Sequence, residues 1–149
     1  MPKIRGLWWD DGAVVRPFPL RDQVPDVLRG VIPDIHWDMG KLHELPGLVE
    51  VKVPVGELAW HLRLPFWSHG GIPFRVCPQD VLDDPDRYRE QWARTLACDL
   101  RFPLHARVNH VDRVVILDGI HRLLKATLLG QDSVQVRVVT DEDLAVISV

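Results

Sequence analysis

The sequence has few of the residues that build disulfide frameworks, serine hydrolase sites or membrane spans. Its two cysteines, Cys77 and Cys98, form no CxxC pair, so both are expected to stay reduced. None of the three serines lies in the glycine-flanked elbow of a serine hydrolase. No apolar run approaches the roughly 18 residues that cross a bilayer, and no signal-peptide pattern is present, so we expect a soluble, cytoplasmic protein without a membrane partner.

The chain also has no excess of positively charged residues. The 149 residues carry a formal net charge of -3, whereas proteins that bind a nucleic-acid backbone usually have a basic face. Nucleic acid is therefore not the favoured partner. Five basic residues leave room for a local patch: Arg101, Arg107, Arg113, Arg122 and Lys125.

The composition predicts one folded unit. With 46% hydrophobic residues and six tryptophans, the chain can bury a core. We expect a domain over residues 48–149 and an N-terminal extension, residues 1–47, packed on it. In that extension Asp11-Gly12 joins two short apolar runs and predicts a β-hairpin. The sequence leaves the oligomeric state open.

The most informative segment is Val114–Ala126, in which an apolar strand runs through an Asp-Gly corner into a helix. Apolar residues recur over Ile120–Leu128 at the spacing of one buried helix face, and Gly130 is placed to end the helix. Asp118 suits the N-cap position. The free amides of the first turn would then gather where the helix macrodipole is positive.

This first turn carries two basic residues, His121 and Arg122, where acidic residues would be favourable. Each exposed cation costs about 0.3 to 1 kcal/mol at that end of a helix. Phosphate would remove the conflict by accepting bonds from the amides and from both side chains. We therefore predict a phosphate-binding site formed by Gly119, Ile120, His121 and Arg122. The alternative is that Asp118 is only a cap, salt-bridged to Arg122, and that His121 is solvated.

The order of strand, Asp-Gly-x-His-Arg, apolar helix, glycine and valine-rich strand resembles the ParB/sulfiredoxin-like superfamily. Upstream, Val51–Leu58 is similar to the first strand and helix start of that fold. Likewise, Arg94–Leu104 is similar to the helix and proline that precede its second strand. The resemblance covers residues 49–139. It implies an α/β (α+β) fold with a small mixed sheet and packed helices, to which the N-terminal hairpin would be added.

Members of this superfamily bind nucleotide phosphates at this helix start. The resemblance thus implies a nucleotide (ATP, ADP or CTP) with Mg²⁺, and Asp118 as a ligand of the metal. Ile120 stands where sulfiredoxins have a reactive cysteine and partition proteins an acidic residue, which disfavours sulfinic acid reduction and chromosome segregation. The serine-kinase-like members carry a catalytic glutamate after the first strand, and this chain lacks it there.

Our leading hypothesis is a phosphotransferase or nucleotide phosphohydrolase that acts on a small polar substrate. In this hypothesis the phosphate-binding residues stabilise charge in the transition state, and Asp118 orients His121 or the magnesium ion. Glu57 or His61 would be the base, since imidazole titrates near neutrality. The alternative from another class is a noncatalytic nucleotide-sensing or nucleic-acid-associated module with a protein partner.

Other elements follow from local patterns. Asp84-Pro85-Asp86 predicts a helix start, the apolar Val114–Leu117 a central strand and Leu144–Val149 a last strand. The glycine- and aromatic-rich connection over residues 62–81 is long enough to be a lid or acceptor pocket near the phosphate site.

Metal-ligand motifs are not recognisable among the seven histidines. His36 with His43, or His61 with His69, would each supply a pair, but neither spacing matches a known zinc motif. Besides Asp118, Asp99 is a candidate ligand for magnesium.

Overall fold

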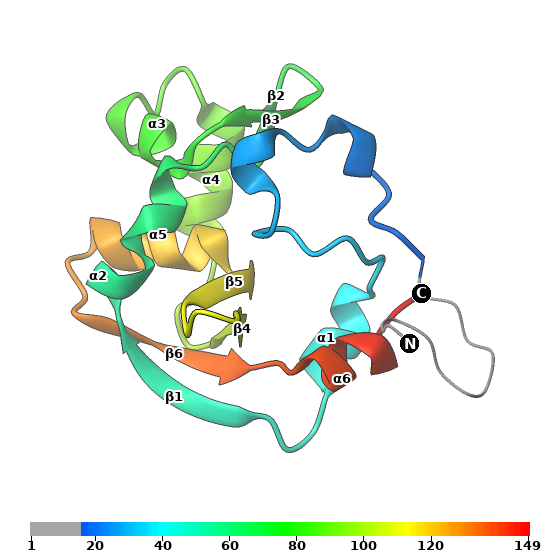
Figure 1. Cartoon of the computed structure of the whole chain (residues 1–149). Coiled ribbons are helices and arrows are strands. Elements are labelled where there is room, and N and C mark those ends of the chain that lie inside the picture. Colours follow the sequence, from blue (N-terminus) through cyan, green and yellow to red (C-terminus); the bar gives the residue numbers. More distant parts are fainter. Residues whose placement is uncertain (1–15) are drawn as a thin grey trace.

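The computed structural model describes residues 16–149 and centres on a four-stranded mixed sheet (Figure 1). Its strands are β1 (Val49–Pro54), β4 (Leu104–Val108), β5 (Val114–Asp118) and β6 (Ser133–Val138). Their order is β1-β6-β4-β5, with β4 and β6 parallel and the two outer pairs antiparallel. The expected small mixed sheet with packed helices is confirmed.

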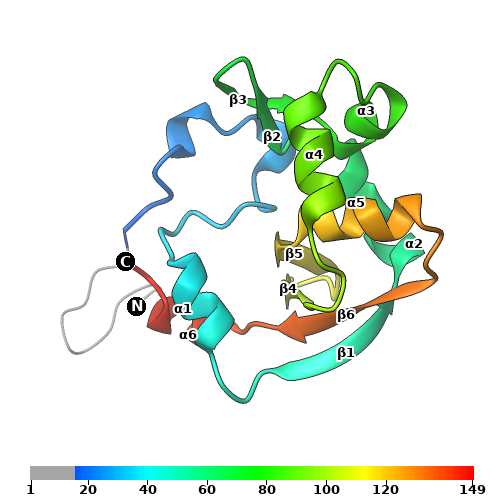
Figure 2. The ribbon, with the colours of Figure 1, turned by 180° about the vertical axis from the view of Figure 1, so that it is seen from behind.

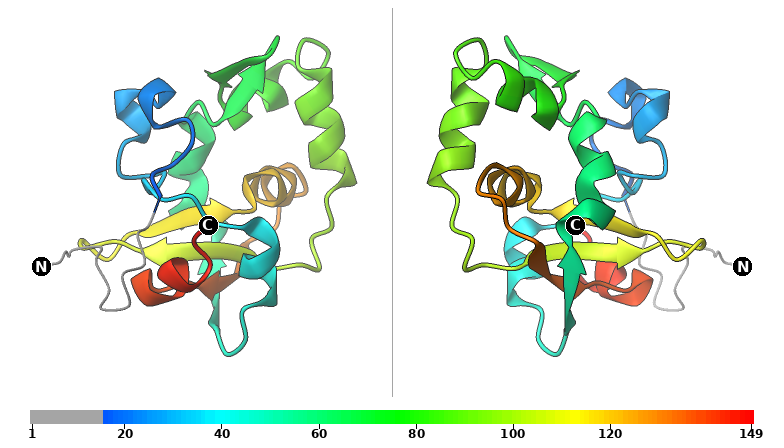
Figure 3. Two further views of the ribbon diagram at one scale, coloured as in Figure 1. Left: turned by 90° about the vertical axis from the view of Figure 1, so that its right-hand side faces the viewer. Right: turned by 90° about the vertical axis from the view of Figure 1, so that its left-hand side faces the viewer.

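Helices cover this sheet mainly on one side (Figure 3). That layer contains α2 (Val55–Leu58), α3 (Pro78–Asp83), α4 (Arg89–Ala97) and α5 (Ile120–Leu128). The shorter α1 (Met39–Glu44) and α6 (Asp141–Val146) lie beside each other at one end of the sheet (Figures 1 and 2). Residues 16–149 also contain three short 3-10 helices: Arg21–Gln23, Asp26–Leu28 and Ala59–Arg63. No helix of the described part of the chain is long and apolar enough to cross a membrane.

The predicted apolar face of α5 is confirmed except at its last residue, Leu128, which is exposed, and the face forms the centre of the main core. Leu123 and Leu124 are fully buried against strand residues such as Leu104 and Val136. Burial of each such leucine stabilises the fold by about 1.5 to 3 kcal/mol. Gly130 follows the helix at φ 71°, as predicted for a C-terminal glycine.

A second apolar cluster joins the segment before β1 to the C-terminal end. Ile35 and Leu42 pack with Val139, Leu144 and Ile147. The residues from 16 to 47 therefore pack on the sheet domain. The predicted N-terminal hairpin falls on residues 7–15 and lies outside the described residues. Within residues 16–149, β2 (Trp67–His69) and β3 (Ile72–Val76) form a hairpin separate from the main sheet. It occupies much of the connection over residues 62–81.

Two predictions about helix starts are wrong. Asp118 is the last residue of β5, and Gly119, at φ 117°, is the N-cap of α5 without a side-chain cap. Asp84 follows the end of α3, and α4 begins only at Arg89, because the chain first reverses direction through a turn in which Asp84 accepts a hydrogen bond from the Arg87 amide.

Two predictions about strands are also wrong. The C-terminal segment forms α6, because Thr140 and Asp143 make a reciprocal capping box and three acidic residues favour the positive helix start. β5 lies at the edge of the sheet, not in its centre. Its apolar residues are buried instead by packing on both faces and along its outer edge.

Gly119 is required at the corner by two independent constraints. Its φ of 117° disfavours any side chain, and an added Cβ would lie 2.7 Å from Leu104 Cγ. We expect Gly119→Ala to lower the free energy of unfolding by about 1 to 3 kcal/mol more than Gly130→Ala, because only the first adds overpacking to backbone strain. Urea denaturation measures both; equal losses would contradict the steric argument.

Candidate functional site

The corner between β5 and α5 brings together side chains that are distant in the sequence. Asp118 Oδ2 lies 2.9 Å from Nε2 of His43, 3.0 Å from Nη2 of Arg122 and 3.7 Å from Nδ1 of His105. The carboxylate is only 16% exposed. The rings of His43 and His105 stack with centroids 5.4 Å apart. Asp118 is thus the centre of a cluster contributed by α1, β4, β5 and α5.

The charge of Asp118 is stabilised by this cluster. Burial alone would raise the pKa of its carboxyl group, but the imidazoles of His105 and His43 and the guanidinium of Arg122 outweigh burial. The pKa of Asp118 therefore lies well below its usual value. At neutral pH the carboxylate is ionised and neutralises Arg122.

His105 is held from its other side by Arg137. Nη1 of Arg137 lies 3.2 Å from Nε2 of His105. Arginine only donates hydrogen bonds, so Nε2 accepts and the ring proton is on Nδ1. That Nδ1 is buried and has no hydrogen-bond partner, since Asp118 at 3.7 Å is too distant for one.

His121 does not point to the same cluster. Its Nε2 bonds Oε1 of Gln91 at 2.9 Å, and its ring stacks on Trp67 with centroids 4.2 Å apart. Burial, together with the charges of Arg94 and Arg122, lowers the pKa of His121 to about 4. The imidazole is therefore neutral at pH 7 and positions two neighbouring side chains.

The predicted charge conflict at the start of α5 is thus resolved within the protein. Arg122 is salt-bridged to Asp118, as the alternative interpretation held, and His121 is uncharged. His121 is half-buried rather than solvated. A bound anion is not required to compensate these two residues, although the first-turn amides still have no side-chain cap.

The two candidate bases lie elsewhere. Glu57 is exposed on α2. His61 is fully buried, with Nδ1 2.8 Å from the Leu58 carbonyl and Nε2 3.0 Å from the Ile116 amide. Burial lowers the pKa of His61 to about 4. This geometry gives His61 a structural role, because both nitrogens bond the backbone.

A cavity of about 410 Å³ opens beside the N-terminal end of α5. Ile120 of the first helical turn lines it, and Gln91 and Arg94 of α4 add polar groups. Its walls contain five aromatic residues: Phe18, Trp37, Phe66, Trp67 and Phe74. The expectation that the connection over residues 62–81 forms a pocket near this helix start agrees with the geometry. The volume is within the range of small-molecule sites.

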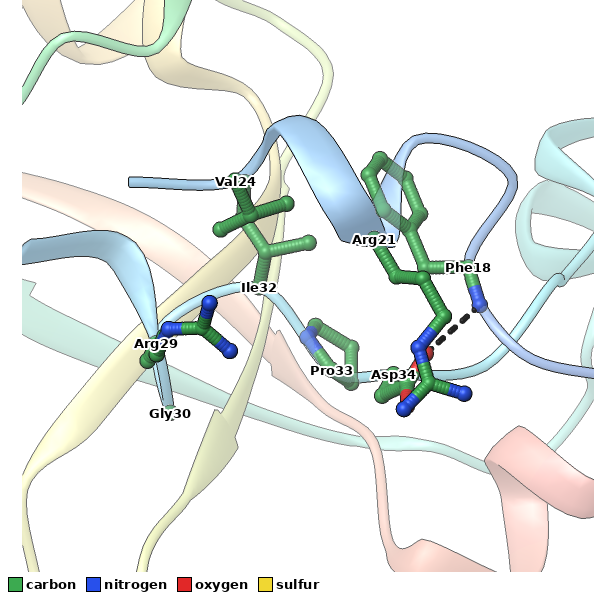
Figure 4. A pocket seen from close by; sticks show the side chains of 8 residues that line it. All are labelled: Phe18, Arg21, Val24, Arg29, Gly30, Ile32, Pro33 and Asp34. Atoms are coloured by element: carbon green, nitrogen blue, oxygen red, sulfur yellow. Dashed lines mark hydrogen bonds and ion pairs between the residues drawn. The ribbon is translucent and has the colours of Figure 1, made fainter. Parts of the chain in front are cut away.

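A second hollow of about 340 Å³ lies in the segment before α1 (Figure 4). There Asp34 accepts a hydrogen bond from the Phe18 amide and forms an ion pair with Arg21 at 3.4 Å. Arg29 is paired with Asp26 outside the hollow. Its charged groups therefore already have partners within the segment.

The basic residues suggested as a local patch are all engaged. Arg101 bonds Asp99 and lowers the pKa of that carboxyl to about 2, Arg107 bonds the Gly30 carbonyl, and Arg122 bonds Asp118. Arg113 lies over the Trp60 ring. Lys125 donates to two carbonyls at the end of α4.

Magnesium at Asp118 was implied by the family resemblance. Mg²⁺ prefers several oxygen ligands, whereas the nearest groups around Asp118 Oδ2 are two imidazoles and a guanidinium. The residues present do not fit a magnesium ion. Sequence reasoning missed His43 and His105 as partners of Asp118, because 75 residues separate His43 from Asp118 and no local motif connects them.

Comparisons with models of known protein families, with curated proteins and with solved structures found no match. The ParB/sulfiredoxin-like resemblance is therefore still a prediction from the motif.

Two histidines, the fully buried His61 and the half-buried His121, predict how stability depends on pH. In the unfolded chain they bind protons near pH 6.5, but in the folded protein His61 and His121 do so only near pH 4. The contribution of these two histidines to the free energy of unfolding is thus fully present above pH 6.5. It is lost as the pH is lowered toward 4, by up to about 1.4 kcal/mol per pH unit for each proton. In urea denaturation from pH 7 to 4.5, His121→Gln should reduce this slope. The exposed control His110→Gln should leave it unchanged; an unaltered slope in His121→Gln would refute the interpretation.

Proposed function

We propose that this protein binds a nucleotide, or a similar phosphate ester of an aromatic ring, in the cavity beside α5. The observation that carries the proposal is that one cavity has aromatic walls, an uncapped helix start and the side chain of Arg94. Aromatic side chains stack on a planar ring, and helix-start amides bind phosphate. The proposal agrees in ligand class with the expectation drawn from the motif.

Two side chains are suited to orient the ligand. The Arg94 side chain is 59% exposed, and within residues 16–149 it makes one ion pair, a long one of 3.9 Å with Glu90, so its guanidinium can turn toward a phosphate. Gln91 also lines the cavity, and the 2.9 Å hydrogen bond between its Oε1 and Nε2 of His121 fixes its side chain. Trp67, which is only 8% exposed and stacks on the same histidine ring, gives the cavity a rigid aromatic wall.

We further propose a noncatalytic, nucleotide-sensing role rather than phosphoryl transfer. Among the described residues that line the cavity, the polar side chains are Ser68, Gln91 and Arg94, and none is an acid or base suited to proton transfer near neutral pH. His61 and His121 are neutral and hydrogen-bonded. This favours the alternative class over the expected kinase or phosphohydrolase.

Arg94→Gln tests the ligand site. We expect ADP, ATP and CTP to raise the melting temperature of the wild type. The variant should bind them roughly 10- to 150-fold more weakly, because a charge-assisted hydrogen bond contributes about 1.5 to 3 kcal/mol. Binding of the uncharged nucleosides should be unchanged. Isothermal titration calorimetry measures the affinities for nucleotides and for nucleosides.

The matched control is Arg89→Gln, which removes an exposed arginine from the same helix outside this cavity. It should bind nucleotides as the wild type does. Equal affinities in Arg94→Gln and the wild type would exclude this site. Phosphate release during incubation with ATP would contradict the noncatalytic role and support an enzyme.

A further inference from the structure

We propose that His43, His105 and Asp118 form a binding site for a first-row transition metal ion, with zinc the best suited. The ligand atoms would be Nε2 of His43, Nδ1 of His105 and Oδ2 of Asp118. This site is separate from the nucleotide cavity, and the proposal does not depend on ligand binding there.

The spacing of the three atoms fits a tetrahedral ion. They all lie within 4.8 Å of one another, with the carboxylate oxygen 2.9 Å from one nitrogen and 3.7 Å from the other. Zinc bonds to nitrogen and oxygen of about 2.0 to 2.2 Å place neighbouring ligands roughly 3.3 to 3.6 Å apart. Small side-chain shifts therefore suffice, and α1, β4 and β5 already hold the three residues in place.

The second observation is the buried nitrogen of His105. This residue is 3% exposed, and its Nδ1 faces Asp118 without a hydrogen-bond partner. A buried polar atom left unpaired costs about 1 to 3 kcal/mol. A metal ion between His105 and Asp118 would give this nitrogen a ligand bond.

Access to the site is through His43. Its side chain is 48% exposed, whereas the other two ligands are largely buried. Solvent can therefore reach the ion on one side, and water would complete the coordination. A site with three protein ligands and one open position is of the kind that catalytic zinc ions occupy.

Two arginines, Arg137 and Arg122, lower the affinity of this site for zinc. Metal binding requires the His105 proton to move from Nδ1 to Nε2, which then faces the donor group of Arg137. It also requires Arg122 to withdraw from Asp118 Oδ2. Because an outer partner that accepts the imidazole proton strengthens metal binding roughly 10- to 100-fold, this site should bind zinc more weakly than sites with such a partner.

Titration of the untagged protein with Co²⁺ and Zn²⁺ tests the site. We expect one ion per chain, with the visible absorption of tetrahedral cobalt displaced by zinc. His43→Ala and Asp118→Asn should each weaken binding at least tenfold. The matched control His36→Ala, which alters the other histidine of the sequence pair, should bind as the wild type does.

The Arg137→Gln substitution should have the opposite effect on zinc affinity. The glutamine oxygen can accept the Nε2 proton of His105, so zinc affinity should rise. A merely structural cluster would show no such gain.

Wild-type NMR spectra decide the result if a variant does not fold. On addition of zinc, the imidazole signals of His43 and His105 should shift, and those of His61 should not. Unchanged signals of His43 and His105 at saturating zinc, or equal affinity in a folded His43→Ala variant, would overturn the proposal.

Discussion

The carboxylate of Asp118 is the constraint on which the corner between β5 and α5 depends. Three elements direct nitrogen atoms to its Oδ2: His43 from α1, His105 from β4 and Arg122 from α5. Because an ionised carboxylate that is largely buried is costly without partners, these elements must pack so that His43 and Arg122 bond it and His105 lies beside it. Gly119 makes this possible, since its backbone conformation lets α5 begin directly after Asp118 and return Arg122 to it.

The same pairing determines the electrostatic character of the helix start. Arg122 is neutralised by Asp118, and His121 is uncharged because it is buried. The positive end of α5 is therefore left to its amides, and Arg94 from α4 is the nearest exposed cation among the described residues that line the cavity. Recognition of an anion here would depend on backbone groups and one flexible guanidinium, rather than on the two residues that the motif singles out.

Local patterns predicted the elements whose determinants are local. The apolar spacing over Ile120–Leu128 and the terminal Gly130 gave α5 correctly. The C-terminal helix also has a local determinant, because Thr140 and Asp143 stand at capping-box spacing, but the apolar run over Leu144–Val149 resembles a strand. The partners of Asp118 could not be predicted, since they depend on how α1 docks, and that follows from packing across the whole chain.

The outer edge of β5 is not paired with another strand of the described chain. The outward amide of Ile116 instead bonds Nε2 of His61, which removes the need for a fifth strand at that position. Val31 and Trp37, from the segment before α1, line the cavity together with Ile116 and Leu117 of β5. A buried neutral histidine thus takes the place of a strand partner at Ile116, and the cavity lies beside the same strand.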